Sequence, residues 1–157
     1  MKIYYKNNDL IIENSDKVNV IYNFKDSSHI NIDDFVINAQ WEYEKSWVLV
    51  EVKLYKWLLF YKVTTDTYKI VIITDFKITL DEEILWFFGD IDILLLPWMK
   101  ESAKLYDDLE AKIVIPFGEW KDVFFNAISQ NIAEVDNYKI SWVLNQDSTE
   151  FVNLKVW

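Results

Sequence analysis

The chain contains 157 residues, of which 52% are hydrophobic and 27% are charged, and its formal net charge is −10. This length suits one domain with a sizeable core, and the acidic balance argues against a nucleic-acid partner, because phosphate backbones are bound by basic surfaces. The absence of cysteine excludes disulfides and thiolate metal sites. No apolar stretch approaches the ~20 residues of a membrane span, and the opening residues do not resemble a signal peptide, so we expect a cytoplasmic protein with no membrane partner.

The first half of the chain predicts short strands separated by polar turns. Runs of β-branched and aromatic residues alternate with segments rich in Asn, Asp and Ser, which is typical of antiparallel sheets. The expected strands cover residues 2–5, 10–13, 18–24, 35–38, 47–55, 58–63 and 68–74. We expect a polar connection over 25–34, a charged turn over 40–46 and a hairpin around Trp57.

The clearest structural signal lies between Asp90 and Pro116. Two apolar runs, 91–96 and 113–115, each end at a proline, and a helical pattern over 99–109 lies between them. A strand, a helix and a second strand of this length predict a parallel crossover unit.

Two further helices and two further strands are expected around this unit. One helix is expected to begin with Thr79 as its N-cap and Glu82 at the capping-box position. A second helix is expected over 121–130, and strands over 139–144 and 150–156. The inward residues of the second helix are expected to be Val123, Phe124, Ala127 and Ile128. This order of elements predicts an α/β sandwich of mostly antiparallel strands with helices packed outside the sheets.

Four segments carry a further signal through their sequence and order. Residues 41–44 read Trp-Glu-Tyr-Glu, and residues 70–75 read Ile-Val-Ile-Ile-Thr-Asp. Residues 89–97 read Gly-Asp-Ile-Asp-Ile-Leu-Leu-Leu-Pro, and residues 113–118 read Ile-Val-Ile-Pro-Phe-Gly. They resemble the Gly-Glu-Tyr-Glu, Gly-Asp, Gly-Asp-Val-Asp-Leu-Leu-Leu-Pro and Ile-Val-Ile-Pro-Met-His segments of the small metallo-β-lactamase-fold hydrolases, in particular the UlaG-like lactonase relatives.

The resemblance implies one truncated metallo-β-lactamase-like αββα domain over residues 1–157, with a C-terminal β-α-β unit, and it also implies that most metal ligands are lost. The family's His-x-His-x-Asp-His segment would fall within 25–34, where His29 is the only histidine, and its terminal histidine corresponds to Gly118. Asp75 matches the bridging aspartate and is the one retained ligand, which we interpret as vestigial. A catalytic zinc needs about three protein ligands, mostly histidines. We therefore expect a non-enzymatic remnant without a cofactor, acting as an interaction or oligomeric module.

Two metal hypotheses remain as alternatives. A residual metal-dependent hydrolase, lactonase-like or esterase-like, would use Asp75 and nearby carboxylates. Asp66, Asp75, Asp90 and Asp92 could together hold Mg²⁺ or Ca²⁺ through oxygen ligands, although no EF-hand spacing supports this. His29 has no second histidine or cysteine near it in the sequence, and we interpret it as a solvated loop residue.

The tryptophans form an unusual pattern. The chain has 8 tryptophans and only 2 glycines, whereas about 11 glycines are expected at the usual ~7%. Trp41, Trp47 and Trp98 stand where the similar family has glycine, and Trp57, Trp120 and Trp142 also fall at expected turns or strand starts. All 16 basic residues are lysine, which is typical of an AT-rich gene. We favour the hypothesis that UGA encodes glycine in this gene and is written here as tryptophan; the alternative is a tryptophan-rich surface that binds a partner.

The loss of the metal-binding segment between Phe24 and Asp34 has a further consequence. It would expose sheet edges and apolar patches, which proteins normally cover, often with a second copy of the chain. We therefore expect a symmetric homodimer.

Overall fold

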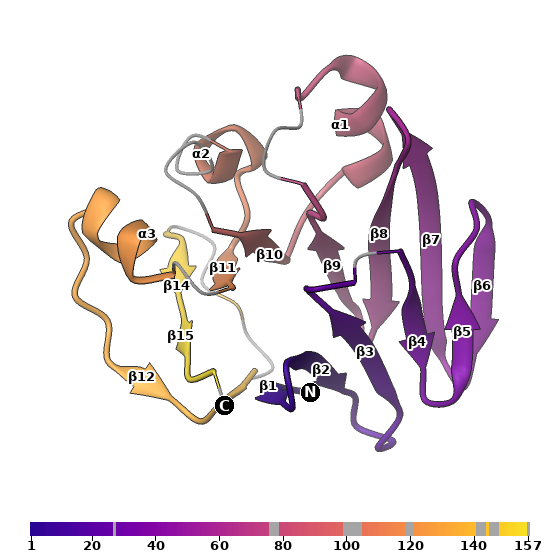
Figure 1. Cartoon of the computed structure of the whole chain (residues 1–157), viewed down its shortest axis with the longest axis horizontal. Helices are drawn as coiled ribbons and strands as arrows, with labels where there is room; N and C mark the ends of the chain where they lie inside the picture. Colours follow the sequence, from indigo (N-terminus) through magenta and orange to yellow (C-terminus); the bar gives the residue numbers. More distant parts are fainter. Residues whose placement is uncertain are drawn as a thin grey trace.

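The computed structural model describes residues 1–26, 28–75, 79–98, 105–118, 121–140, 144 and 148–156. Within these residues two large sheets pack face to face, and short helices lie on the outer side of one of them (Figure 1). No helix in the described residues is long and apolar enough to cross a membrane.

The first sheet has six strands in the order β13-β1-β2-β3-β4-β5, and each neighbouring pair is antiparallel. Its strands are β1 (Lys2–Lys6), β2 (Asp9–Glu13), β3 (Asn19–Asn23), β4 (Ile30–Ile32), β5 (Phe35–Ile37) and β13 (Asn137–Lys139). The alternation of apolar and polar residues along β1 and β3 turns one face of this sheet toward the core.

The second sheet has seven strands in the order β14-β11-β10-β9-β8-β7-β6. Its strands are β6 (Glu42–Lys45), β7 (Val48–Tyr55), β8 (Leu58–Thr65), β9 (Tyr68–Ile72), β10 (Ile93–Pro97), β11 (Ile113–Phe117) and β14 (Glu150–Phe151). The strands from β6 to β9 are antiparallel, whereas β9, β10, β11 and β14 are parallel. The predicted crossover is confirmed by the parallel pairing of β10 with β11, and a small parallel ladder joins β12 (Glu134–Val135) to β15 (Asn153–Leu154).

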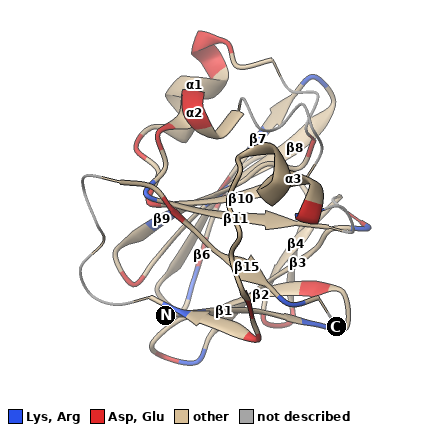
Figure 2. Cartoon of the chain, turned by 90° about the vertical axis from the view of Figure 1, so that its left-hand side faces the viewer, with Lys and Arg blue, Asp and Glu red and all other residues tan. Residues whose placement is uncertain are grey.

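The described helices cover the outer face of the seven-stranded sheet. They are α1 (Glu82–Phe88), α2 (Leu105–Leu109) and α3 (Lys121–Ala127). Ile84, Leu105 and Phe124 pack with Val71 and Leu94 in one apolar cluster, while the alternate residues of the same strands face the six-stranded sheet. Because β10 and β11 are buried on both faces, they appear in the sequence as continuous apolar runs, and they carry no charged residue (Figure 2).

Several sequence expectations differ from the structure at the ends of elements. The N-cap of α1 is Asp81 rather than Thr79, since the Asp81 carboxylate accepts a hydrogen bond of 3.2 Å from the Ile84 backbone N–H. Residues 99–104 of the expected central helix, and 141–143 of the strand expected over 139–144, lie outside the described residues.

Three strands were missed, and one helix face was assigned only partly correctly. β12 lies outside every expected strand. β4 lies within the expected polar connection, and β6 lies within the expected charged turn. β6 has only half-buried or exposed residues because it is the edge strand of its sheet, so it lacks an apolar signal. In α3 the buried residues are Lys121, Phe124 and Phe125, whereas Val123 is 41% exposed.

Candidate functional site

The strand ends that would hold a metal in the expected fold meet at one edge of the seven-stranded sheet. Because β9, β10 and β11 are parallel, their carboxyl ends lie on the same side, and they lead into Asp75, Trp98 and Gly118. The Ile73 backbone N–H donates to the Leu95 carbonyl at 3.0 Å, and the Trp98 N–H donates to the Phe117 carbonyl at 3.0 Å. These bonds hold the three strand ends in register, with Asp75 half-buried among them.

Aromatic rings fill the interior beside this edge. Tyr22, from the six-stranded sheet, packs edge-on against Phe117 with ring centroids 5.7 Å apart and against Tyr61 at 6.2 Å. Phe24 lies 6.3 Å from Phe117 and 6.2 Å from Tyr5. The Phe24–Phe117 pair is tilted, and each of the three edge-to-face pairs contributes about 0.5–1.5 kcal/mol beyond the burial of its area. We call these five residues the aromatic plug.

The tyrosine hydroxyls of the aromatic plug are not ionised, so they do not offer phenolate ligands to a metal. Burial raises the pKa of Tyr5, Tyr22 and Tyr61 far above the ordinary tyrosine value, so the three phenols are neutral at physiological pH. The Tyr5 hydroxyl faces the Gly118 backbone but makes no hydrogen bond of ordinary geometry. The plug therefore stabilises the packing of the two sheets and adds no charged side chain beside this edge.

His29 lies in the loop that joins β3 to β4 and finds its polar contacts within that loop. Its Nδ1 is 3.3 Å from the Ser28 hydroxyl and 3.7 Å from the Asp26 carboxylate. Asp26 also accepts hydrogen bonds from the Ser28 hydroxyl and backbone N–H, and the first of these is the main reason that the pKa of Asp26 is lowered. The His29 side chain is 33% exposed. Asp26, Ser28, Trp57 and Leu58 help to line an open cavity of about 690 Å³ beside this loop.

The four aspartates proposed as an oxygen-ligand site do not lie together. Asp66, Asp90 and Asp92 precede strands β9 and β10, whereas Asp75 follows β9. β9 has five residues, so the two groups are separated by roughly 17 Å at about 3.3 Å per residue. The hypothesis of a shared Mg²⁺ or Ca²⁺ site is therefore wrong. No group of three or more His, Cys, Asp or Glu side chains in the described part of the chain is arranged to share a metal ion.

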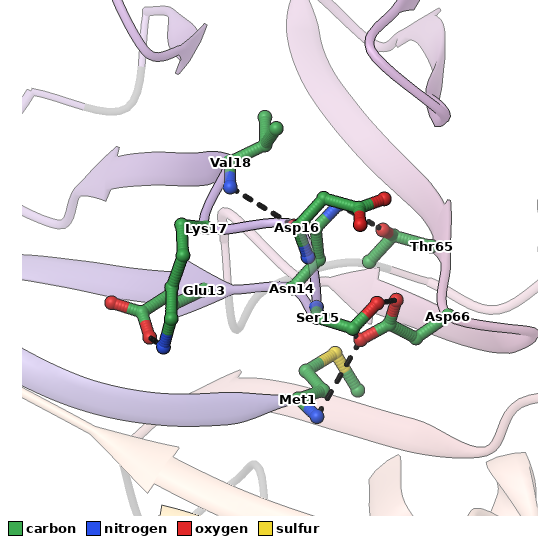
Figure 3. Close-up of polar contacts among 9 residues, drawn as sticks. All are labelled: Met1, Glu13, Asn14, Ser15, Asp16, Lys17, Val18, Thr65 and Asp66. Carbon is green, nitrogen blue, oxygen red and sulfur yellow. Dashed lines mark hydrogen bonds and ion pairs between the residues drawn. The ribbon is translucent and has the colours of Figure 1, made fainter.

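Asp66 instead belongs to a polar contact between the two sheets. Its carboxylate accepts hydrogen bonds from the Ser15 backbone N–H at 2.7 Å and the Ser15 hydroxyl at 2.6 Å, and it lies 3.5 Å from the amino group of Met1 (Figure 3). Beside it, the buried Asn14 amide donates to the Thr65 hydroxyl at 3.3 Å. At the same end of the sheet, Asp92 accepts from the Lys69 backbone N–H and pairs with Lys112 at 2.7 Å.

One buried lysine belongs to a polar cluster that could not be predicted from the sequence. Lys121 begins α3 and is 7% exposed. Its ammonium donates to Asn153 Oδ1 at 2.9 Å, to the Leu154 carbonyl at 2.6 Å and to the Glu134 carboxylate. It joins α3 to β12 and β15. In the sequence, a lysine at the start of an amphipathic helix cannot be distinguished from an ordinary surface lysine.

The tryptophans in the described residues divide by exposure. Trp41, Trp47 and Trp57 are 74%, 81% and 92% exposed, whereas Trp98 is 4% exposed and packs edge-on against Phe124 with ring centroids 4.7 Å apart. Trp120 and Trp142 lie outside the described residues. Of the four glycine-like tryptophan positions that lie in the described residues, three are exposed and Trp98 is buried.

One solved structure is similar to this arrangement along nearly its whole length. It is the crystal structure of a proposed Zn-dependent hydrolase of the metallo-β-lactamase superfamily from Thermotoga maritima, with a TM-score of 0.76 and 17% sequence identity over 98% of each chain. No protein-family model matches the sequence, and no curated protein matches it at a significant level. At this identity the likeness concerns the fold and not the activity. The chain has a metallo-β-lactamase-like fold, built mostly of strands in mixed sheets with a few short helices.

Proposed function

We propose that this chain is a cytoplasmic, non-enzymatic remnant of a UlaG-like metallo-β-lactamase-fold hydrolase, without the His-x-His-x-Asp-His segment, and that it acts as an interaction or oligomeric module. The observation that carries this proposal is the aromatic plug beside the strand ends. Tyr22 and Phe24 both pack there against Phe117, while Gly118 offers no side chain and Asp75 offers one carboxylate.

The chemistry of the fold gives the reason for the lost activity. Hydrolysis would need a metal-bound hydroxide, because bulk water is too weak an acid to ionise at neutral pH. Zinc prefers imidazole nitrogen or thiolate ligands, and the chain has one histidine and no cysteine. His29 makes its contacts with Asp26 and Ser28 in its own loop. Asp75 alone would bind a metal weakly.

Elemental analysis of protein purified without chelator tests this part of the proposal. We expect no stoichiometric zinc or manganese, and no lactonase, esterase or phosphodiesterase activity above background, in the unsubstituted chain or in Asp75→Ala. Asp90→Ala is the matched control, because the Asp90 side chain is 98% exposed at the other end of the parallel strands. Bound metal and hydrolysis that are lost in Asp75→Ala and kept in Asp90→Ala would restore the hydrolase alternative.

We also propose a symmetric homodimer that forms through β5. This strand ends the six-stranded sheet in the described residues, and its Phe35 and Val36 are 44% and 51% exposed. Apolar side chains on a sheet edge are normally covered, and a second copy is the partner to which we assign this role. The neighbouring edge strand β6 is less suitable for self-pairing. The Val52 N–H donates to the Trp41 carbonyl at 2.8 Å, so in this antiparallel pair the backbone N–H and C=O groups of Glu42 and Glu44 point away from β7, to the open edge. Two copies that paired through this edge would bring the carboxylates of Glu42 and Glu44 close together, and like charges there repel.

The mass in solution tests the dimer. Light scattering should show twice the chain mass at micromolar concentration, and Val36→Lys should shift the protein to monomer. Glu44→Lys is the control and should leave the mass unchanged, because β6 is not at the proposed interface. A monomer mass that does not change with concentration would refute the dimer, and a dimer that survives Val36→Lys would exclude β5 as its interface.

A further inference from the structure

Two tryptophans occupy backbone positions where side chains are poorly tolerated. The turn between β6 and β7 passes through Ser46 and Trp47 with φ angles of 52° and 64°, and the turn between β7 and β8 passes through Lys56 and Trp57 with φ angles of 49° and 71°. A two-residue hairpin loop in which both φ angles are positive is a type I′ turn. Glycine is strongly preferred there because it has no Cβ to clash with the backbone.

Burial does not compensate for this backbone conformation. The residues Trp47 and Trp57 are 81% and 92% exposed. A bulky residue at positive φ is an outlier that a fold normally retains only when packing or function requires it. Here each indole extends into solvent from the tip of a hairpin, so neither supplies packing that would hold the turn.

The other positive-φ sites in the described residues hold asparagine, aspartate, serine, threonine, lysine, glutamate and glycine, so Trp47 and Trp57 are the only aromatic residues in this set. Asn7 and Asn8 form a similar turn with φ angles of 54° and 71°, and asparagine is among the residues that tolerate this region. Both glycines of the chain, Gly89 and Gly118, also lie at positive φ, with values of 58° and 100°. Thr67, at 71° in the turn between β8 and β9, is the one β-branched residue in the set.

Two other tryptophans, Trp98 and Trp86, do not lie at positive φ. Trp98 is buried, and its indole N–H has no hydrogen-bond partner in the described structure, although buried indoles usually find one. Trp86 lies inside helix α1 and is 88% exposed. Glycine is disfavoured in the interior of a helix, so the backbone conformation at this position does not favour glycine over tryptophan.

We propose that Trp47 and Trp57 are glycines in the natural protein, encoded by UGA codons that the source organism reads as glycine, and that Trp86 is a true tryptophan encoded by UGG. The proposal explains two features together: the scarcity of glycine in a chain rich in hairpins, and tryptophan at the glycine positions of two turns. It also means that the indoles at these turns are not a surface for a partner.

The direct test is to read the codons in the source genome and to sequence peptides of the natural protein by mass spectrometry. We expect UGA at positions 47 and 57, UGG at position 86, and glycine in the peptides that contain residues 47 and 57. UGG at position 47 or 57, or tryptophan in either natural peptide, would overturn the proposal.

A stability measurement on the chain that carries tryptophan at positions 47 and 57 tests separately whether these residues strain the two turns. Relief of the strain from a Cβ at positive φ should raise the folding equilibrium constant about tenfold for Trp47→Gly, and by a similar factor for Trp57→Gly. Trp47→Ala removes the same exposed indole but keeps the Cβ, so it should give a clearly smaller increase. Trp86→Gly should lower the constant about twofold. Equal gains from Trp47→Gly and Trp47→Ala, or no gain from either glycine substitution at the turns, would contradict the argument.

Discussion

Replacement of the buried lysine, Lys121→Met, should destabilise the chain by about 3 kcal/mol, because two buried acceptors lose their donor. The Asn153 side-chain oxygen and the Leu154 carbonyl bind the ammonium at 2.9 and 2.6 Å, and both residues are buried. An unsatisfied buried acceptor costs about 1–3 kcal/mol, while methionine keeps most of the side-chain volume. Glu134, whose side chain is 48% exposed, can return to water and adds little.

Urea unfolding followed by circular dichroism measures this change. Lys17→Met is the matched control, since Lys17 also pairs with a carboxylate, Glu13, at 2.8 Å, but its side chain is 78% exposed. An exposed pair of this kind contributes about 0.2–1 kcal/mol, so the control should shift the unfolding midpoint only slightly. If both variants lose the same stability, or if Lys121→Met loses less than about 0.5 kcal/mol, the assignment of a structural role to the buried ammonium is wrong.

Two further predictions concern polar groups at the ends of elements. The pKa of Asp81 is lowered, first by the hydrogen bond from the Tyr55 hydroxyl, so its contribution to stability should be present above the unfolded pKa and lost as the pH falls through the folded value. Stability measured from pH 6 to pH 2 should therefore fall less steeply below about pH 4 in Asp81→Asn than in the unsubstituted chain, and identical slopes would contradict this. Asn14→Leu should cost about 2–4 kcal/mol by urea unfolding, because the Asn14 side-chain oxygen accepts from the Asp16 and Val18 backbone N–H groups at 3.0 and 2.9 Å. Asn126→Leu, at an exposed position of helix α3 outside this network, would serve as its control, and equal losses would count against the network.

The central strands could be predicted well from the sequence because strands that are buried on both faces consist almost entirely of apolar residues. β10 and β11 are covered on both faces, so only apolar residues suit them. β10 ends at Pro97, and β11 ends at Phe117, directly after Pro116. The hairpin around Trp57 was also confirmed, by the pairing of β7 with β8. Edge elements were harder to predict. β6 consists of Glu, Tyr, Glu and Lys because one of its sides has no partner strand, and that pattern is typical of a turn as much as of a strand.

The candidate site was only partly predictable for a different reason. Asp75 was placed correctly at the carboxyl end of a parallel strand, since the end of an apolar run can be seen in the sequence. The sequence did not reveal that Asp66 and Asp92 lie at the opposite end of the sheet, or that Tyr22 from one sheet reaches Phe117 of the other. Such contacts depend on the packing of elements far apart in the chain. Lys121 was missed because its acceptors, on Asn153 and Leu154, are more than 30 residues away.

We propose that this chain, with its metallo-β-lactamase-like fold, holds no metal centre, and a zinc titration of chelator-treated protein tests this proposal most directly. Calorimetry or a competing chromophoric chelator would measure the affinity in the unsubstituted chain, in Asp75→Ala and in Asp90→Ala. The account predicts weak binding that does not saturate at one ion per chain and is the same in all three proteins. Tight binding of one zinc ion per chain that is lost in Asp75→Ala and kept in Asp90→Ala would contradict it.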